Sequence, residues 1–103
     1  MMNISFDSLG YGQLTSLSSA VTVASATIGG AVGIPAGTEQ VVLQAETQNV
    51  RYRDDNASPT ASVGMILQAN VIYTFTVAQI AQMKVIEVTA SAKLNITCYG
   101  RKT

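Results

Sequence analysis

The most informative stretch of the chain is Val50-Arg51-Tyr52-Arg53-Asp54-Asp55-Asn56-Ala57-Ser58-Pro59-Thr60. In its first half, Val50 and Tyr52 alternate with Arg51 and Arg53, which is the period of two that a strand with one buried face shows. Its second half is rich in residues that favour turns, and the proline holds the residue before it in an extended conformation. The stretch therefore predicts a half-buried strand that turns over at a polar corner.

Strand patterns continue on both sides of this corner. Glu39–Glu46 places Val41, Leu43 and Ala45 on one face and Gln40, Gln44 and Glu46 on the other. In Ala92–Tyr99, apolar and polar side chains alternate. Further runs with strand-like composition are Ala20–Ile28, Ala61–Leu67, Val71–Thr76 and Lys84–Thr89. Short strands separated by turn residues are typical of an antiparallel sandwich or barrel. We therefore predict an all-β antiparallel sandwich of about seven or eight short strands with no long helix.

The same alternation predicts the core. Seven in-phase apolar residues are expected inside: Val41, Leu43, Val50, Tyr52, Ile86, Leu94 and Ile96. Ala78–Met83 has a helix-like pattern but is too short for a stable helix, so we expect a turn there.

Composition limits the class of protein. The 103 residues correspond to one domain spanning residues 1–103, and only 12% of them are charged, about half of the roughly 25% found in ordinary globular proteins. The formal net charge is zero, so the surface resists self-association poorly, which favours a subunit of an assembly. A neutral chain also lacks the basic patch that nucleic-acid binding requires.

The N-terminal third carries almost no charge. No charged residue lies between Asp7 and Glu39, and residues 1–20 are a candidate N-terminal arm. Glycine, serine and threonine dilute the apolar content below the ~20 apolar residues of a membrane span. Residues 1–7 lack a basic region followed by an apolar one, so we do not expect them to be a secretory signal. We expect synthesis in a cytoplasm, with part of this segment covered by another chain. On this view, removing residues 1 to about 20 leaves the sandwich folded but weakens oligomerisation or binding to the particle.

Few residues can support chemistry. The chain has no histidine, which excludes imidazole-based nucleophile pairs and metal sites. Cys98 alternates in phase with Leu94 and Ile96, so we expect a buried and inert thiol. Asp54-Asp55-Asn56 could contribute to a calcium site, but the spaced ligands of a calcium loop are missing, so turn hydrogen bonds and pairing with Arg51 or Arg53 are the favoured interpretation. We predict no catalytic residue, cofactor or metal.

The order of several motifs resembles a known group of proteins. These motifs are Ile34–Gly37, Val50–Asp55, Pro59–Ala61 with Gly64, and Ala92–Ile96 followed by Tyr99. Together they resemble small virion proteins of tailed bacteriophages, of the capsid decoration or cement type, which are β-sandwiches or jelly rolls. The resemblance covers roughly residues 34–99. Members of the group often have a glycine where Asn56 stands here, and another in the turn at Gln68–Asn70.

The resemblance implies a structural function. Such proteins bind the outside of an assembled head and tie neighbouring capsomers together, so the implied partners are the major capsid protein and further copies of the chain, as a dimer or trimer. The implied location is the virion surface, after synthesis in the host bacterium. The candidate contact residues are Arg51, Arg53, Asp54 and Asp55, at the polar corner.

Other functions remain open. A phage tail or baseplate protein, or a receptor-binding sandwich, would have a similar composition. A carbohydrate-binding module normally needs exposed aromatic platforms, and only four tyrosines and two phenylalanines are available. A hydrolase lacks its catalytic groups.

Overall fold

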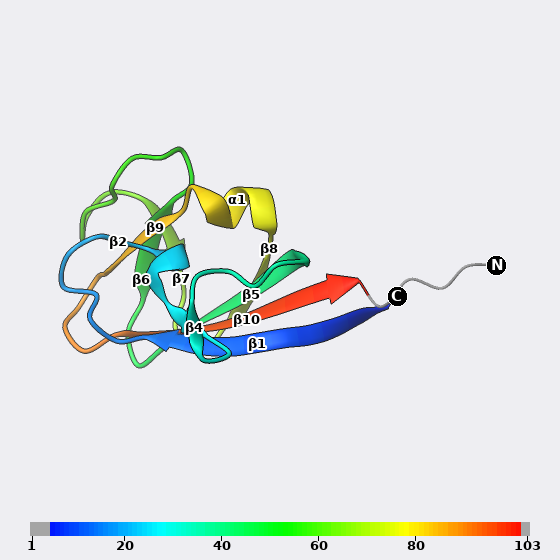
Figure 1. Ribbon diagram of the computed structural model, residues 1–103. Coiled ribbons are helices and arrows are strands. Elements are labelled where there is room, and N and C mark those ends of the chain that lie inside the picture. The colour runs from blue at the N-terminus through cyan, green and yellow to red at the C-terminus, as the bar shows by residue number, and fades with distance from the viewer. Residues whose placement is uncertain (1–4, 102–103) are drawn as a thin grey trace.

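Two four-stranded antiparallel sheets enclose the core of the protein. The computed structural model describes residues 5–101. Sheet A has the order β1-β10-β5-β8 and sheet B the order β2-β9-β6-β7 (Figure 1). The strands of sheet A are β1 (Phe6–Leu14), β10 (Lys93–Arg101), β5 (Thr38–Glu46) and β8 (Ile72–Thr76). Those of sheet B are β2 (Val21–Thr22), β9 (Lys84–Glu87), β6 (Val50–Arg53) and β7 (Met65–Leu67). The prediction of an all-β antiparallel sandwich is confirmed.

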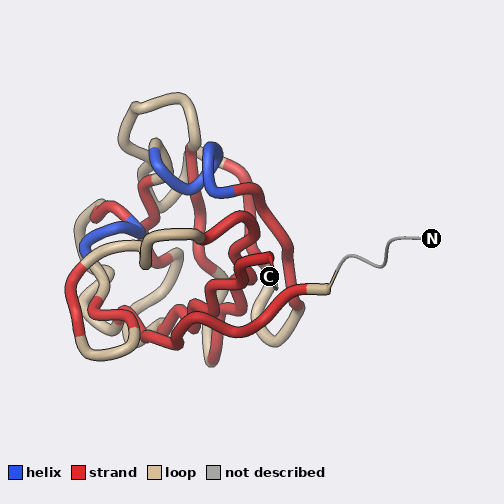
Figure 2. The backbone as a smooth tube through the Cα atoms, turned by 45° about the vertical axis from the view of Figure 1, so that its right-hand side comes forward, coloured by secondary structure: helices blue, strands red, loops and turns tan. Residues whose placement is uncertain are grey.

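Four short elements complete the fold. The strands β3 (Thr27–Ile28) and β4 (Ala31–Val32) form a separate hairpin, and η1 (Val23–Ser25) is a single 3-10 turn. The one α-helix of the described residues, α1 (Val77–Ala81), follows β8 (Figure 1), and the helical segments are blue in Figure 2. No helix within residues 5–101 is long and apolar enough to cross a membrane.

The strand order is that of a jelly roll. Four antiparallel pairs are nested in the sequence, namely β1 with β10, β2 with β9, β5 with β8, and β6 with β7. Together these pairs form one long two-stranded ribbon, which is rolled up. The additional pairs β10–β5 and β9–β6 connect successive layers of the ribbon and so create the two sheets. This is the double-sheet arrangement with two Greek keys that defines the jelly roll. The β6–β7 pair is the innermost end of the ribbon, so the polar corner found in the sequence is its tip.

Most of the predicted core is correct. Val41, Leu43, Val50, Leu94 and Ile96 have no exposed surface. Tyr52 is partly buried against this core, where its ring meets Phe75 edge to face with centroids 5.2 Å apart.

The prediction of Ile86 as a core residue is wrong. Val85 has no exposed surface, whereas Ile86 is only partly buried and lies opposite Arg51 on the outer face of sheet B. Two adjacent apolar residues leave the phase of a strand ambiguous, and pairing with Tyr52 on β6 places Val85 inside.

Three predicted segments also differ from the structure. Ala61–Leu67 is a strand only from Met65 onward, because residues 61–64 belong to the loop after β6. Ala20–Ile28 is not one strand, because η1 interrupts it: the Ala26 N–H bonds to the Val23 carbonyl at 3.1 Å, and both residues are buried. Ala78–Met83 is not a simple turn, since α1 overlaps it. A capping box stabilises this helix, in which the Thr76 hydroxyl accepts from the Gln79 N–H and the Gln79 side chain accepts from the Thr76 N–H. The buried Ile80 fastens the helix to the core.

The N-terminal segment is part of the sandwich. β1 pairs with β10 from Phe6 to Leu14, with one irregularity between Ser8 and Gly10. The next segment places Leu17 in the core with only 1% of its surface exposed. A truncation through residue 20 would therefore remove an edge strand of sheet A and a core side chain together.

This placement yields a test of the N-terminal segment. Leu17→Ala should lower the free energy of unfolding by about 2–5 kcal/mol, because it leaves a cavity in a packed core. Leu9→Ala is the matched control, since Leu9 is 38% exposed and the same truncation should cost less than ~1 kcal/mol there. Chemical denaturation measures both, and equal losses would contradict a core role for Leu17.

Candidate functional site

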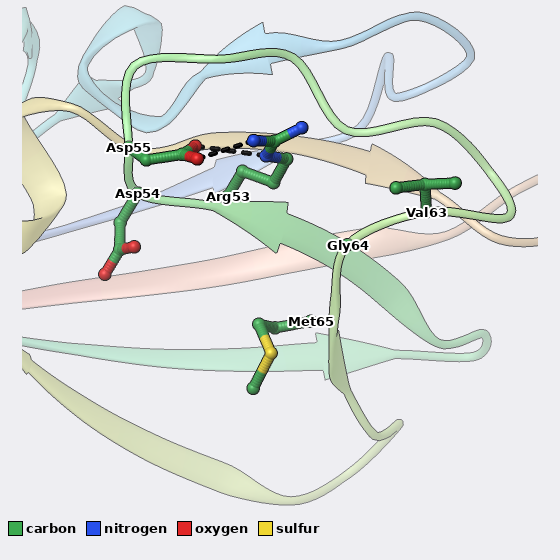
Figure 3. A pocket seen from close by; sticks show the side chains of 6 residues that line it. All are labelled: Arg53, Asp54, Asp55, Val63, Gly64 and Met65. Atoms are coloured by element: carbon green, nitrogen blue, oxygen red, sulfur yellow. Dashed lines mark hydrogen bonds and ion pairs between the residues drawn. The ribbon is translucent and has the colours of Figure 1, made fainter.

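The predicted contact residues lie at the tip of the rolled ribbon. The corner loop, residues 54–64, joins β6 to β7 and borders a shallow hollow of about 270 Å³. Its lining residues are Arg53, Asp54, Asp55, Val63, Gly64 and Met65 (Figure 3). Arg53 and Asp55 lie on one side of the β6 ribbon, whereas the Met65 side chain points to the other. The hollow therefore combines one ion pair with exposed apolar groups.

Arg51 donates hydrogen bonds to two carbonyl groups of the corner loop. Its Nε donates to the Ala61 carbonyl at 3.0 Å and its Nη1 to the Gly64 carbonyl at 2.7 Å. Gly64 has a φ of +139°, and a Cβ there would lie 3.0 Å from the Tyr52 carbonyl oxygen and 3.1 Å from Cβ of the buried Pro59. The loop thus folds back tightly onto β6. Arg51 lies on the outer face, as predicted, but its guanidinium is engaged within the chain.

Arg53 and Asp55 form a two-pronged ion pair. Arg53 Nε donates to Asp55 Oδ1 at 3.0 Å, and Nη2 donates to Oδ2 at 2.5 Å. The Arg53 guanidinium lowers the pKa of Asp55, and a bond from the Ala57 N–H contributes in the same direction. The predicted pairing of Asp55 with an arginine of this strand is confirmed. The next residue, Asn56, has a positive φ of 66°, a conformation that asparagine tolerates better than most residues.

Asp54 is the outward-facing acid of the corner. It is exposed, and its side chain points away from the Arg53–Asp55 pair (Figure 3). Burial raises the pKa of the Tyr52 phenol, and the negative charge of Asp54 raises it further. Asp54 is thus the carboxylate of the hollow that takes no part in the ion pair.

The corner is not built as a metal centre. Within residues 5–101, no three or more His, Cys, Asp or Glu side chains converge. The hollow has two carboxylates, and Arg53 already neutralises one of them. A calcium ion normally takes six to eight oxygen ligands, which is more than these two carboxylates supply.

A second candidate surface was missed from the sequence. On the outer face of sheet A, Asn95 of β10 joins side chains of β1 and β5 into one network. Its Oδ1 accepts from the Tyr11 hydroxyl at 2.5 Å and from Gln13 Nε2 at 2.8 Å. Its Nδ2 donates to Glu46 Oε2 at 2.8 Å. The network borders a hollow of about 250 Å³ whose other lining residues are Val42, Gln44, Ile72, Thr97 and Tyr99.

Only the sheet register brings this network together. Gln13 lies opposite Asn95, and Asn95 lies opposite Gln44 on the next strand. These three residues are separated by 31 positions or more in the sequence, and each alone is an ordinary polar residue on the outer face of a strand. The one local sign of an outward position was that Asn95 lies between Leu94 and Ile96, which face inward.

Cys98 is buried, as predicted. It has no exposed surface, and burial raises the pKa of its thiol, while a hydrogen bond with Thr38 acts in the opposite direction. A thiol of this kind is largely protonated at neutral pH, which makes it a poor nucleophile.

Comparisons with known proteins gave no match. No protein-family model, no curated protein and no solved structure was significantly similar to the chain. The strand order and the surface of the protein are therefore the features that bear on its function.

The Arg53–Asp55 pair predicts a pH dependence. Because the pKa of Asp55 is lowered from about 3.8 in the folded state, the pair stabilises the fold above that pH, and this contribution is lost as the pH falls through the folded pKa. Asp55→Asn should therefore lower the melting temperature slightly at pH 7 and reduce its further fall between about pH 5 and pH 2.

Asp54→Asn is the matched control, because Asp54 is the neighbouring exposed acid outside the ion pair. Asp54→Asn should leave the melting temperature at pH 7, and the fall of the melting temperature at low pH, close to the wild-type values. Added calcium should not raise the melting temperature of the wild type. A strong calcium-dependent rise that Asp55→Asn abolishes would replace the ion pair with a metal site.

Proposed function

We propose that the protein is a non-enzymatic structural subunit of a tailed-bacteriophage virion, a decoration protein that binds the outer surface of the head and stabilises contacts between capsomers. The observation that carries the proposal is the jelly-roll strand order, an architecture used by viral capsid proteins as well as lectins and cupins. A fold alone does not define a function, so the surface has to supply further support.

The exposed side chains support the proposal that other chains cover part of this protein. Among residues 5–101, nine large apolar residues are exposed: Phe6, Leu9, Tyr11, Val32, Val63, Met65, Ile66, Val71 and Ile72. Between Asp55 and Lys84 the chain has no charged residue, and the same is true between Asp7 and Glu39. Exposed apolar residues gathered on uncharged segments mark interaction surfaces in soluble proteins.

The corner hollow is the contact that we assign to the major capsid protein. Arg53, Asp54 and Asp55 present charge there beside Val63 and Met65, which are 55% and 64% exposed. Apolar contact area next to a few oriented charges is typical of protein interfaces. Arg51 has a different role in this proposal, because its bonds to Ala61 and Gly64 hold the loop in shape.

The outer face of sheet A favours an alternative function. Tyr11, Gln44 and Asn95 border a hollow with amide, hydroxyl and ring groups, which is the chemistry that binds hydroxyl-rich ligands. A receptor-binding or tail protein would use such a surface toward host glycans.

Quantitative mass spectrometry of purified particles tests the proposal. A decoration protein should occur in a fixed, high copy number relative to the major capsid protein, and purified protein should bind undecorated heads saturably. Asp54→Lys should weaken that binding about fivefold or more, because it reverses a charge in the proposed contact.

Asp7→Lys is the control, since it makes the same charge change at an exposed position of β1. It should bind like the wild type. Absence from particles, or a few copies located at the tail, would contradict the decoration function, and the second result would favour the alternative.

A further inference from the structure

The two sheets have four edge strands, and three of them are protected. β2 and β7 are only two and three residues long, and short edges are poor templates for pairing with another chain. β1 is irregular between Ser8 and Gly10, and the β3–β4 hairpin lies against it, with the Gly29 N–H bonded to the Tyr11 carbonyl at 3.2 Å. Gly12 allows this approach, because a Cβ there would lie 2.3 Å from the Thr27 carbonyl oxygen.

The free edge of β8 has no such protection. Ile72–Thr76 pairs with β5 on one side, and within residues 5–101 no backbone group bonds to Ile72–Phe75 from the other side. The strand contains no charge, no proline and no glycine, although natural proteins commonly use lysine, proline or a bulge to block an open edge. Val71 and Ile72, at its start, are 41% and 65% exposed.

Neighbouring segments turn away from this edge. α1 packs toward β5 and η1, with Ile80 buried. The loop before β8 bonds inward, because the Asn70 N–H donates to the Ala45 carbonyl at 2.7 Å and the Ala69 N–H donates to Asn49 Oδ1 at 2.8 Å. The edge is therefore open to an incoming strand.

The backbone groups of Thr74 face outward. The Thr76 N–H bonds to Gln79 Oε1 at 2.8 Å, so it points away from β5. Since the peptide groups of a strand alternate between its two sides, the N–H and C=O of Thr74 point the same way as that N–H. Thr74 lies at the centre of the five-residue strand, which makes the edge symmetric about it.

We propose that the free edge of β8 pairs antiparallel with β8 of a second copy about a twofold axis at Thr74. The two Thr74 residues then exchange a pair of backbone hydrogen bonds, and Tyr73 lies opposite Phe75 of the second copy. Ile72 lies opposite Thr76 of the second copy, which covers an exposed side chain. Threonine pairs, aromatic pairs and β-branched pairs are favourable across strands, and no charge meets a like charge. Sheet A becomes one continuous eight-stranded sheet.

A second copy is the occupant that this edge fits best. A twofold axis requires a self-complementary surface, and a strand that is uncharged and symmetric about Thr74 provides one. Five paired residues form a small interface, so we expect a dissociation constant in the micromolar range. This dimer deepens the self-association included in the proposed function, and its test uses purified protein, so it can fail while the chain still occurs in particles.

Sedimentation velocity over about 1 μM to 1 mM measures the dimer. Thr74→Lys places two ammonium groups across the axis and should raise the dissociation constant about tenfold or more. Thr97→Lys is the matched control, because Thr97 lies in the same cross-strand row two strands further from the edge, opposite Val42. It should change the constant less than about threefold.

A cysteine variant tests the geometry directly. Paired Thr74 residues would have Cα atoms about 5.5 Å apart, so Thr74→Cys should form an intermolecular disulfide on mild oxidation. Thr97→Cys should not, and Cys98 is buried in both proteins. A wild-type protein that is monomeric at 1 mM, equal effects of the two lysine variants, or equal crosslinking of the two cysteine variants would each overturn the proposal. A monomer whose head binding is lost in Thr74→Lys would assign the edge to the capsid instead.

Discussion

The pairing of β5 with β10 is the constraint on which the fold depends. These two nine-residue strands run from Lys93 opposite Glu46 to Gly100 opposite Thr38. Their inner faces supply six residues without exposed surface: Val41, Leu43, Ala45, Leu94, Ile96 and Cys98. Because β10 also pairs with β1 and β5 with β8, this one contact joins the outermost pair of the rolled ribbon to an inner one. If one of these strands slipped by one residue, its three inward side chains would turn outward, so the apolar pattern also sets the register.

Because the fold depends on this strand pairing, some parts of the structure could be predicted from the sequence and others could not. β6 and β10 alternate cleanly, and in β5 the polar Gln40, Gln44 and Glu46 set the phase although Val41 and Val42 are adjacent. The positions and inner faces of these three strands therefore follow from the sequence alone. β9 does not alternate, since Val85 and Ile86 are adjacent, and only its pairing with β6 chooses Val85. The capping box of Thr76 and Gln79 was readable in the sequence and could have revealed α1. At the site, the Arg53–Asp55 pair is local and was predicted, whereas the network around Asn95 depends on contacts across the sheet.

The same topology relates the surface to assembly. A jelly roll is two open sheets, so four strand edges remain, and in this protein short strands, an irregularity and the β3–β4 hairpin protect all but β8. The polar corner and the free edge of β8 both belong to the part of the chain that runs from β6 to β8. This part has no charged residue between Asp55 and Lys84. A contact that needs orientation can use the ion pair at the corner, and a contact that needs a partner strand can use the edge.

Amide hydrogen exchange at a series of protein concentrations tests most directly the claim that β8 is the assembly edge. The N–H of Thr74 faces outward and should exchange rapidly in dilute protein, then become protected as the concentration rises through the micromolar range. Amides of β1, including that of Gln13, should keep the same exchange rate throughout. Protection of Thr74 that does not change with concentration, or concentration-dependent protection confined to β1, would contradict the account.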